Sequence, residues 1–274
     1  LENAASSLSF PLAQLYQFSL STCTVPKEWK LASVTPIFKE GKSCDVSNYR
    51  PISLTSVCCK IMESLIKDEL LSYLLSKCLI TRQQHGFLTR RSTGTQLDCL
   101  NDWTLNIESK QSLDVIYIDL AKAFDSVVHS KLISKLKSYG IGGNLLRWIE
   151  HFLSDRYQFV SVDGTHSTTI RVGGVPQGSV LSPILFCIYI NDVCDIIVGN
   201  TACKLYADDL KLYSCVDIDG MSCDLDASLT NLILWADKWQ VSVNFNKCNV
   251  MRIGSNTSLG VYVFGSEVIP RVES

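Results

Sequence analysis

The stretch "KLYADDLKLY", residues 204–213, places two aspartates side by side between short runs of leucine and tyrosine. Residues on both flanks alternate between opposite faces, which is the pattern of extended strands. The stretch therefore predicts a β-hairpin with Asp208 and Asp209 at its tip. Since Asp-Asp lacks the Asn-Gly or Asp-Gly chemistry that tight hairpin turns prefer, the pattern indicates a role besides turning.

The aspartate pair by itself carries little information. With 18 Asp in 274 residues, chance alone predicts about one adjacent pair, and the chain contains one. A third carboxylate adds to it, because Asp119 lies in the apolar segment "LDVIYIDLA", residues 113–121, where an uncompensated charge is unfavourable. Two interpretations stay open from spacing alone: Asp119 caps a helix that begins near Ala121, or it joins the aspartate pair at a metal site.

The metal-site interpretation has a definite chemistry. Like charges resist sharing a site unless a cation offsets their repulsion. Acidic, oxygen-rich sites suit Mg²⁺ or Mn²⁺, and two such ions about 4 Å apart catalyse in-line phosphoryl transfer in polymerases and nucleases. If strand 113–121 pairs beside the hairpin, Asp119, Asp208 and Asp209 converge on such a site.

Length and composition bound the class of protein. The 274 residues suffice for one large domain or two small ones with a substantial core. A hydrophobic content of 46% and a charged content of 19% are those of a globular protein. The net charge of −2 argues mildly against a nucleic-acid binder, which usually carries a basic surplus, but leaves room for a local basic groove.

The cysteines and the N-terminal residues indicate where in the cell the protein is located. Twelve cysteines occur without a C-x-x-C pair or a Cys/His cluster at zinc spacing, so we interpret them as reduced thiols of an intracellular protein. Nucleus and cytoplasm are the expected locations. The first residue is Leu rather than Met, which indicates a fragment, and no signal peptide is recognisable. The longest apolar run, "VLSPILFCIYI", has 11 residues and a proline, too short to cross a bilayer, so no membrane partner is expected.

Periodicity predicts a mixture of helices and antiparallel strands, without regular βαβ alternation, and therefore an α+β fold. The expected helices cover residues 8–20, 61–79, 93–109, 129–139, 144–153, 183–197 and 225–240. The expected strands are 31–39, 113–121, a hairpin over 157–172 with Asp163-Gly164 as its turn, the hairpin over 204–213, and terminal strands over 247–255 and 259–270.

Three segments in this order resemble motifs A, B and C of reverse transcriptases: "YIDLAKAFDSVVH" (117–129), "GGVPQGSVLSPILFCIYIND" (173–192) and "LYADDLKLY" (205–213). Two earlier segments, "WKLASVTPIFKEGKSCDVSNYRPISL" (29–54) and "QHGFLTRRSTGTQL" (84–97), are similar to the finger motifs of that family, and "WADKWQVSVNFNKCNVM" (235–251) to motif D. The pattern most resembles the non-LTR (LINE-type) retrotransposon enzymes. The resemblance covers nearly all the chain, and six motifs in order make it specific.

The resemblance implies a right-hand polymerase fold with an antiparallel palm sheet and flanking helices, the thumb largely absent. Residues 1–274 would form a single reverse transcriptase domain, with fingers mainly in 1–112 and palm mainly in 113–270. The thumb and an endonuclease would lie outside this chain. The implied activity is that of a nucleotidyltransferase, an RNA-directed DNA polymerase of retrotransposon replication. Its partners would be an RNA template, a DNA primer and dNTPs, and its cofactor two Mg²⁺ ions, with Mn²⁺ as a substitute.

The resemblance also implies roles for single residues around the metals. Asp119 matches the motif A metal ligand, Asp208 the main motif C ligand, and Asp209 its neighbour. Lys247 matches the motif D lysine, which would protonate the leaving pyrophosphate. A surface charge is the competing interpretation of that lysine.

Further residues match nucleotide and template contacts. Phe124 lies five positions after Asp119, where reverse transcriptases carry an aromatic steric gate that favours dNTPs. Viral RNA polymerases usually carry Asp at that position. In this chain Asp follows one residue later, at 125, and its side chain would face away from the metals. The triphosphate would contact Lys39 and Arg50. The remaining expected contacts are Gln177 near the sugar and template base, Gly178 as a close backbone approach, and Arg90 and Arg91 at template phosphates.

Two other functions stay open. A catalytically silent retroelement fragment that only binds nucleic acid or a partner would fit the slightly negative net charge. An RNA-dependent RNA polymerase would share the Asp-Asp hairpin and would prefer NTPs to dNTPs.

Overall fold

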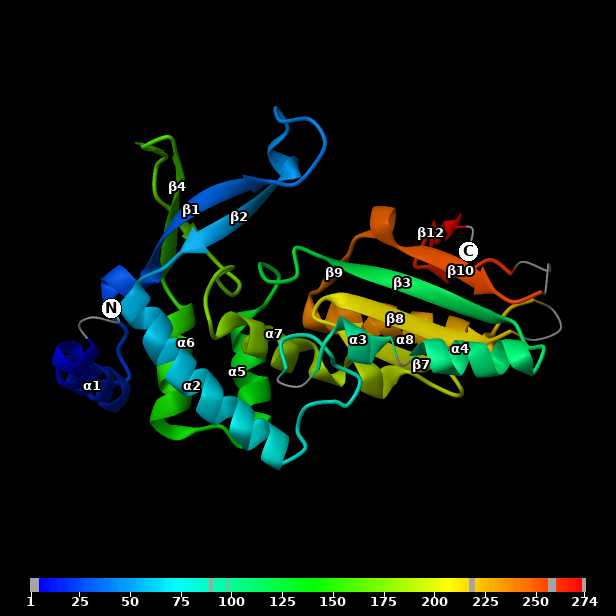
Figure 1. Cartoon of the computed structure of the whole chain (residues 1–274), viewed down its shortest axis with the longest axis horizontal. Coiled ribbons are helices and arrows are strands. Elements are labelled where there is room, and N and C mark those ends of the chain that lie inside the picture. Colours follow the sequence, from blue (N-terminus) through cyan, green and yellow to red (C-terminus); the bar gives the residue numbers. More distant parts are fainter. Residues whose placement is uncertain (1–4, 89–90, 98, 217–219, 256–259, 273–274) are drawn as a thin grey trace. The chain divides into compact units, whose positions relative to one another are not determined.

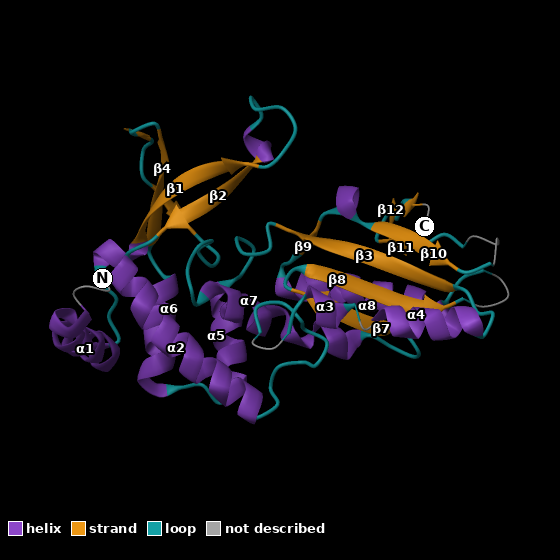
Figure 2. Ribbon diagram, in the orientation of Figure 1, coloured by secondary structure: helices purple, strands orange, loops and turns teal. Residues whose placement is uncertain are grey.

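The computed structural model describes residues 5–88, 91–97, 99–216, 220–255 and 260–272. Helices and strands are mixed, which confirms the α+β prediction (Figure 2). The chain divides into two compact units: residues 1–79 with 127–185 form the first unit, and residues 80–126 with 186–274 form the second.

The helical part of the first unit is built on apolar stripes. Its elements are α1 (Ala5–Thr22), η2 (Lys27–Lys30), η3 (Val46–Asn48), α2 (Val57–Ser76), α5 (His129–Ser138) and α6 (Gly143–Leu153). Helix α6 contacts both α1 and α5. Trp148 of α6 is fully buried, stacks on Phe152 with ring centroids 5.3 Å apart, and donates from Nε1 to Ser19 Oγ at 2.9 Å. The predicted helices over 8–20, 61–79, 129–139 and 144–153 are therefore confirmed, with shifted ends.

The sheet of the first unit has the order β2-β1-β4-β5, with β6 also paired to β4 (Figure 1). Its strands are β1 (Leu31–Phe38), β2 (Tyr49–Leu54), β4 (Arg156–Val162), β5 (Thr165–His166) and β6 (Ile170–Val172). Asp163 and Gly164 connect β4 to β5 with φ values of 47° and 77°, the positive values that a type I′ turn requires. The predicted Asp-Gly turn is confirmed, whereas strand β2 was not predicted.

The sheet of the second unit is centred on β3 (Leu113–Ala121), a strand that has the predicted bounds. The strand order is β13-β10-β3-β8-β7, with β9 paired to the end of β3, and every pair but β10-β13 is antiparallel. The other strands are β7 (Ala202–Tyr206), β8 (Asp209–Cys215), β9 (Ser242–Val243), β10 (Asn249–Ile253) and β13 (Arg271–Val272), beside a separate pair, β11 (Val263–Phe264) and β12 (Glu267–Val268).

Helices cover this second sheet. On one face, Cys99 and Trp103 of α4 (Cys99–Glu108) pack against Leu113, Val115 and Tyr213. Helix α8 (Cys223–Trp239) contacts β8 and runs behind it in Figure 1. The remaining helical elements are α3 (Thr93–Gln96), α7 (Ser182–Ile190), η4 (Asn191–Ile196) and η5 (Phe245–Lys247).

Three predicted elements differ from the structure. The helix expected over 93–109 is divided into α3 and α4. The helix expected over 183–197 ends at Ile190 and continues as the 3₁₀ turns of η4, and Pro183 is its second residue rather than its first. The long strand expected over 259–270 is instead the short β11-β12 pair, since two-residue strands leave too weak an alternation to place from sequence.

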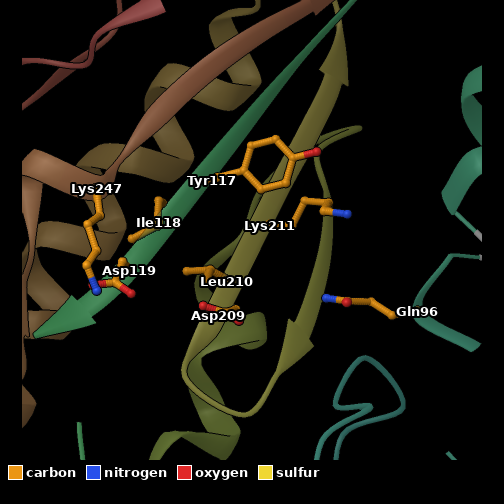
Figure 3. Close-up of a pocket in the computed structure, with 8 residues that line it drawn as sticks. All are labelled: Gln96, Tyr117, Ile118, Asp119, Asp209, Leu210, Lys211 and Lys247. Carbon is orange, nitrogen blue, oxygen red and sulfur yellow. The ribbon is translucent and has the colours of Figure 1, made fainter. Parts of the chain in front are cut away.

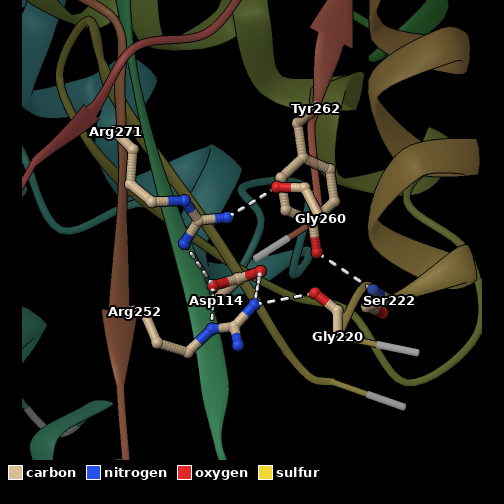
Figure 4. A network of polar contacts seen from close by, with 7 residues as sticks. All are labelled: Asp114, Gly220, Ser222, Arg252, Gly260, Tyr262 and Arg271. Atoms are coloured by element: carbon tan, nitrogen blue, oxygen red, sulfur yellow. Dashed lines mark hydrogen bonds and ion pairs between the residues drawn. The ribbon is translucent and has the colours of Figure 1, made fainter. Parts of the chain in front are cut away.

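Asp114 anchors one end of β3 through a buried polar network (Figure 4). Its carboxylate accepts hydrogen bonds from Arg252 at 2.5 Å and 2.8 Å and from Arg271 at 3.2 Å. The two guanidinium groups also donate to the carbonyls of Gly220 and Gly260, each at 2.8 Å. The network joins β3, β10 and β13 to the loops around them.

Within the described residues, no helix has the length and apolar character that crossing a bilayer requires.

Candidate active site

Strand pairing brings two of the predicted carboxylates together. Strands β3 and β8 are antiparallel, with Asp119 directly opposite Asp209. Residues directly opposite each other point to the same face of a sheet. Figure 3 shows both carboxylates among the side chains that line one pocket. Two residues 90 positions apart in the sequence therefore share one site.

The hairpin that carries the aspartate pair is confirmed, but its tip was predicted one residue too far along the chain. Tyr206 pairs with Asp209, so the two turn residues are Ala207 and Asp208, and Asp209 is the first residue of β8. Ala207 has a positive φ of 56°. That conformation costs a residue other than glycine on the order of 1–3 kcal/mol. Strand alternation placed the apolar Ala207 in the first strand, because alternation carries no information about such strain.

The helix-cap interpretation of Asp119 is wrong. Strand β3 continues to Ala121, turns follow over 122–126, and α5 begins only at His129. The carbonyl of Asp119 accepts from the N–H of Asn244 at 2.8 Å, which fixes the end of the strand. The carboxylate is thus left available for the pocket.

The site is negatively charged and only partly compensated. Partial desolvation first, and then the charges of Asp208 and Asp119, raise the pKa of Asp209 above its usual value, while Lys247 opposes the shift. The Lys247 ammonium lies 3.4 Å from Asp119 Oδ2, with 64% of the lysine side chain and 23% of the aspartate side chain exposed. Added positive charge would therefore stabilise the ionised form of Asp209.

The pocket around these carboxylates also contains cations. It is lined by Gln96, Tyr117, Ile118, Asp119, Asp209, Leu210, Lys211 and Lys247. The Lys211 ammonium lies over the rings of Trp103 and Tyr117, 5.2 Å and 5.1 Å from their centroids. Such contacts orient an ammonium group without neutralising it. The pocket offers carboxylate ligands for a cation and ammonium groups for an anion.

The fit of the site to a divalent metal rests on its donors. In the parts of the chain that the structure describes, no three His, Cys, Asp or Glu side chains are grouped closely enough to hold a metal ion. The donor chemistry nevertheless suits a hard cation, because Asp119 and Asp209 offer carboxylate oxygens on one face and Asp208 is adjacent. Their mutual repulsion is what a bound cation would offset.

Phe124 is held by two other aromatic rings. It stacks on Phe186 with centroids 5.1 Å apart and an interplanar angle of 14°, and it meets Phe87 edge to face at 6.2 Å. Its side chain is neither fully buried nor fully exposed, and the neighbouring Asp125 is exposed. The ring therefore has a fixed orientation and a free surface, as a steric gate needs, although contact with a sugar stays a prediction.

The predicted triphosphate cations belong to the first unit. Arg50 lies on β2 opposite Ile37, and the N–H of Lys39 donates to the carbonyl of Asn48 at 2.9 Å, one step beyond the end of β1. Residues two apart on a strand share a face, so Lys39 and Arg50 lie on the same face of the β1-β2 hairpin. Both side chains are exposed.

Gln177 and Gly178 lie in the loop before α7, against β2. The carbonyl of Gln177 accepts from the N–H of Ser53 at 2.9 Å. A Cβ on Gly178 would lie 2.4 Å from the carbonyl oxygen of Ser53, and its φ is 113°, so only glycine fits. The predicted close approach at Gly178 is therefore to the chain itself.

Glu63 holds the same loop and was not predicted. It is fully buried on α2 and accepts from the N–H groups of Val180 and Leu181 at 2.7 Å and 3.0 Å, and from the Ser179 hydroxyl. A carboxylate there satisfies donors that the start of a helix leaves unpaired. The only signal in the sequence is a charged residue within an otherwise apolar helical stripe.

The structure describes only one of the two predicted template arginines. Arg90 lies outside the described residues. The Arg91 guanidinium donates to the carbonyls of Thr81 and Arg82 at 3.1 Å and 3.0 Å, and to that of Gln84, and burial lowers its pKa. Arg91 thus stabilises its own loop, and its contact with a template stays a prediction.

Similar solved structures define the class of fold. Over 90% of this chain, the fold is similar to a telomerase from Candida tropicalis truncated from its C-terminal domain, with a TM-score of 0.60, 15% identity and 54% of that chain covered. A Candida albicans telomerase, solved with a fragment of telomeric RNA, gives a TM-score of 0.59 at 14% identity, over 94% of this chain and 48% of that one. The fold is that of a right-hand polymerase.

The family follows from sequence. Residues 37–266 match the family model described as reverse transcriptase (RNA-dependent DNA polymerase), and the chain belongs to that family. It is 33% identical over 256 residues to the RNA-directed DNA polymerase from mobile element jockey of Drosophila melanogaster, covering 90% of this chain and 28% of that protein.

A second curated relative is the Pol polyprotein from the type-1 retrotransposable element R2 of Popillia japonica, with 31% identity over 177 residues, 59% of this chain and 23% of that protein. The resemblance to non-LTR retrotransposon reverse transcriptases is confirmed. The chain spans less than a third of the length of these relatives. Members of the family depend in general on divalent metal ions.

Proposed function

We propose that this chain provides the RNA-directed DNA polymerase activity of a non-LTR retrotransposon, adding dNTPs to a primer 3′-hydroxyl on an RNA template. One observation carries the proposal: Asp119 lies directly opposite Asp209 on paired strands, beside Asp208, in a chain of the reverse transcriptase family. Metal-assisted phosphoryl transfer needs a carboxylate cluster of this kind. The proposed partners are the RNA template, a DNA primer and dNTPs.

Asp119, Asp208 and Asp209 would hold two Mg²⁺ ions, for which Mn²⁺ would substitute. Bound there, the ions would lower the pKa of the primer hydroxyl and offset charge on the triphosphate. Electrostatics supports this assignment, because neighbouring carboxylates help to raise the pKa of Asp209 and a cation would reverse that shift.

Lys247 is the proposed proton donor to the leaving pyrophosphate. Its ammonium is 3.4 Å from Asp119 Oδ2 and its side chain is largely exposed. A divalent cation at Asp119 would offset the same negative charge, so the lysine would be free to move to the pyrophosphate. There it would act as a general acid.

The remaining roles concern substrate binding. Lys39 and Arg50, on one face of the β1-β2 hairpin, would bind the triphosphate. Phe124 would exclude a ribose 2′-hydroxyl, Gln177 would contact the sugar and template base, and Arg90 and Arg91 the template. Fingers would comprise mainly residues 1–112 and palm mainly residues 113–270. Twelve free thiols support an intracellular location. Nucleus and cytoplasm are the proposed compartments.

A silent fragment that only binds nucleic acid is the second candidate. The observation that favours it over an active enzyme is that, within the described residues, no three His, Cys, Asp or Glu side chains are grouped closely enough to hold a metal ion. It predicts retention of primed RNA template without extension.

The test is extension of a primed RNA template by the wild type with dNTPs or NTPs, with and without EDTA. Extension with dNTPs that requires a divalent ion and is abolished by Asp208→Asn would support the proposal. Asp237→Asn is the matched control, since Asp237 is exposed on α8, and it should extend the primer at the wild-type rate. Preference for NTPs would instead indicate an RNA polymerase, and equal activity of Asp208→Asn would remove that residue from the mechanism.

A further inference from the structure

The backbone of residues 83–86 lies alongside β7, the first strand of the aspartate hairpin. The N–H of His85 donates to the carbonyl of Leu205 at 2.8 Å, and the N–H of Leu205 donates to the carbonyl of Gln83 at 2.9 Å. These bonds form a parallel bridge between Gln84 and Leu205. A segment about 120 residues earlier in the chain thus supports the edge of the hairpin.

The Gln84 side chain bonds the turn itself. It is 1% exposed, and its Oε1 accepts from the N–H of Ala207 at 3.0 Å and from the N–H of Gly86 at 2.7 Å. Its Nε2 donates to the carbonyl of Ala207 at 3.4 Å. One buried amide therefore pairs with both peptide groups of the first turn residue, and a buried amide is costly to leave unpaired.

The residue held in this way is the strained one. Ala207 is buried and has a φ of 56°, a conformation that persists in a non-glycine residue only where its surroundings enforce it. Gly86 permits the contact, because a Cβ there would lie 2.3 Å from the Ala207 nitrogen. Asp208 follows Ala207 directly, so the conformation of Ala207 sets where the Asp208 carboxylate points.

Repulsion makes such a support necessary. Asp208, Asp209 and Asp119 carry like charges, and Lys247 is the cation nearest to Asp119 that the described contacts provide. Without a restraint, the turn would relax to relieve both the strain and the repulsion. The amide of Gln84 is uncharged, so it can restrain the turn without competing for the metal.

We propose that Gln84 is a positioning residue for the catalytic aspartates: it holds the Ala207–Asp208 turn in its strained conformation and so keeps the carboxylates ready for divalent cations. This inference rests on the proposed function for its catalytic meaning. It predicts that the affinity for divalent metal depends on one side-chain amide that contacts neither metal nor substrate.

The test is Mn²⁺ binding by isothermal titration calorimetry, without nucleotide or template, for the wild type and the Gln84→Met variant. Methionine has a similar length but no hydrogen-bonding amide. We expect about tenfold weaker Mn²⁺ binding, the loss that follows from one or two net hydrogen bonds, with an unchanged KM for dNTP in extension assays and a lower kcat. Gln83→Met is the matched control, because the Gln83 side chain is exposed and bonds only Thr81 among its described contacts.

A second variant separates positioning from folding. Glycine adopts a positive φ without strain, so adding Ala207→Gly to Gln84→Met should restore part of the Mn²⁺ affinity. A merely structural glutamine would give no such recovery, and circular dichroism melts would check the fold of each variant.

The inference about Gln84 and the proposed polymerase function can fail independently. Wild-type Mn²⁺ affinity in folded Gln84→Met would overturn the inference even if the wild type is an active polymerase. Weaker Mn²⁺ binding by Gln84→Met, with recovery by Ala207→Gly, would support it even if the wild type extends no primer.

Discussion

Two aspartates on one strand, Asp114 and Asp119, stand in opposite electrostatic settings. They are five residues apart on β3, an odd spacing that sends their side chains to opposite faces. Asp114 is fully buried and bonded by Arg252 and Arg271 (Figure 4). Asp119 is partly exposed, lies opposite Asp209, and has one largely exposed ammonium 3.4 Å away (Figure 3).

The two settings indicate different roles for the carboxylates at the two ends of β3. Burial alone would raise the pKa of Asp114, but its hydrogen bonds to Arg252 and Arg271 lower it below the usual value. At the other end of β3, where Asp119 faces Asp209 of β8, desolvation and like charges raise the pKa of Asp209. Where the chain supplies two guanidinium groups, a carboxylate stabilises the fold. Where it supplies one largely exposed lysine, we propose that the carboxylates bind a divalent cation.

The largest effect is expected at Asp119. We expect Asp119→Asn to lower dNTP incorporation by at least about a thousandfold, since metal ligation is worth several kcal/mol to the transition state. Its thermal stability should equal or exceed that of the wild type, because a like charge is removed. Single-nucleotide extension and a melting curve measure both quantities. A large loss of stability would mean that Asp119 is structural like Asp114.

The converse variant is Asp114→Asn. Removing one partner of a buried ion pair leaves Arg252 uncompensated and should cost about 3–5 kcal/mol of unfolding free energy. Urea denaturation would measure the loss, with Asp237→Asn as an exposed control that changes little. A stability close to that of the wild type would show that the network is dispensable.

Acid should affect the stability of the wild type and of Asp114→Asn differently. The folded-state pKa of Asp114 is depressed, so its contribution to stability is present above the ordinary value of 3.8 and is lost as pH falls through the depressed value. Wild-type stability should therefore fall more steeply below about pH 4 than that of Asp114→Asn. Urea midpoints at several acidic pH values would decide this, and parallel curves would contradict it.

The smallest effect is expected at Lys247. Its pairing with Asp119 is exposed, so Lys247→Ala should change the unfolding free energy by less than about 1 kcal/mol. Extension should slow by about tenfold or more, the range of a lost general acid. Lys238→Ala on α8 is a control lysine outside the pocket. An unchanged extension rate would leave Lys247 as a surface charge.

Much of the fold follows from local pattern. Strand β3 has the predicted bounds because apolar residues fill it and polar segments end it. The Asp163-Gly164 turn follows from residues that tolerate a positive φ. The carboxylates Asp119, Asp208 and Asp209 were found through ordered motifs, which carry family information that spacing alone does not.

The supports of the site were beyond sequence reasoning. Gln84 acts on Ala207 from more than 100 residues away, and Glu63 acts at a similar distance on the loop of Gln177. Neither residue type signals such a partner. The one-residue shift of the turn has the same origin, since a strained alanine is enforced by tertiary contacts that the local sequence does not encode.

The chain passes between its two compact units three times, near residues 79, 126 and 185. Each unit is therefore assembled from two separated pieces of sequence. Protein engineers who wish to express one unit alone would have to join its pieces with a new linker, because a single cut anywhere in the chain leaves at least one unit incomplete. A recombinant that exchanges a continuous block between two such elements would combine pieces of different origin within a unit, even if both of its crossovers coincide with these passages.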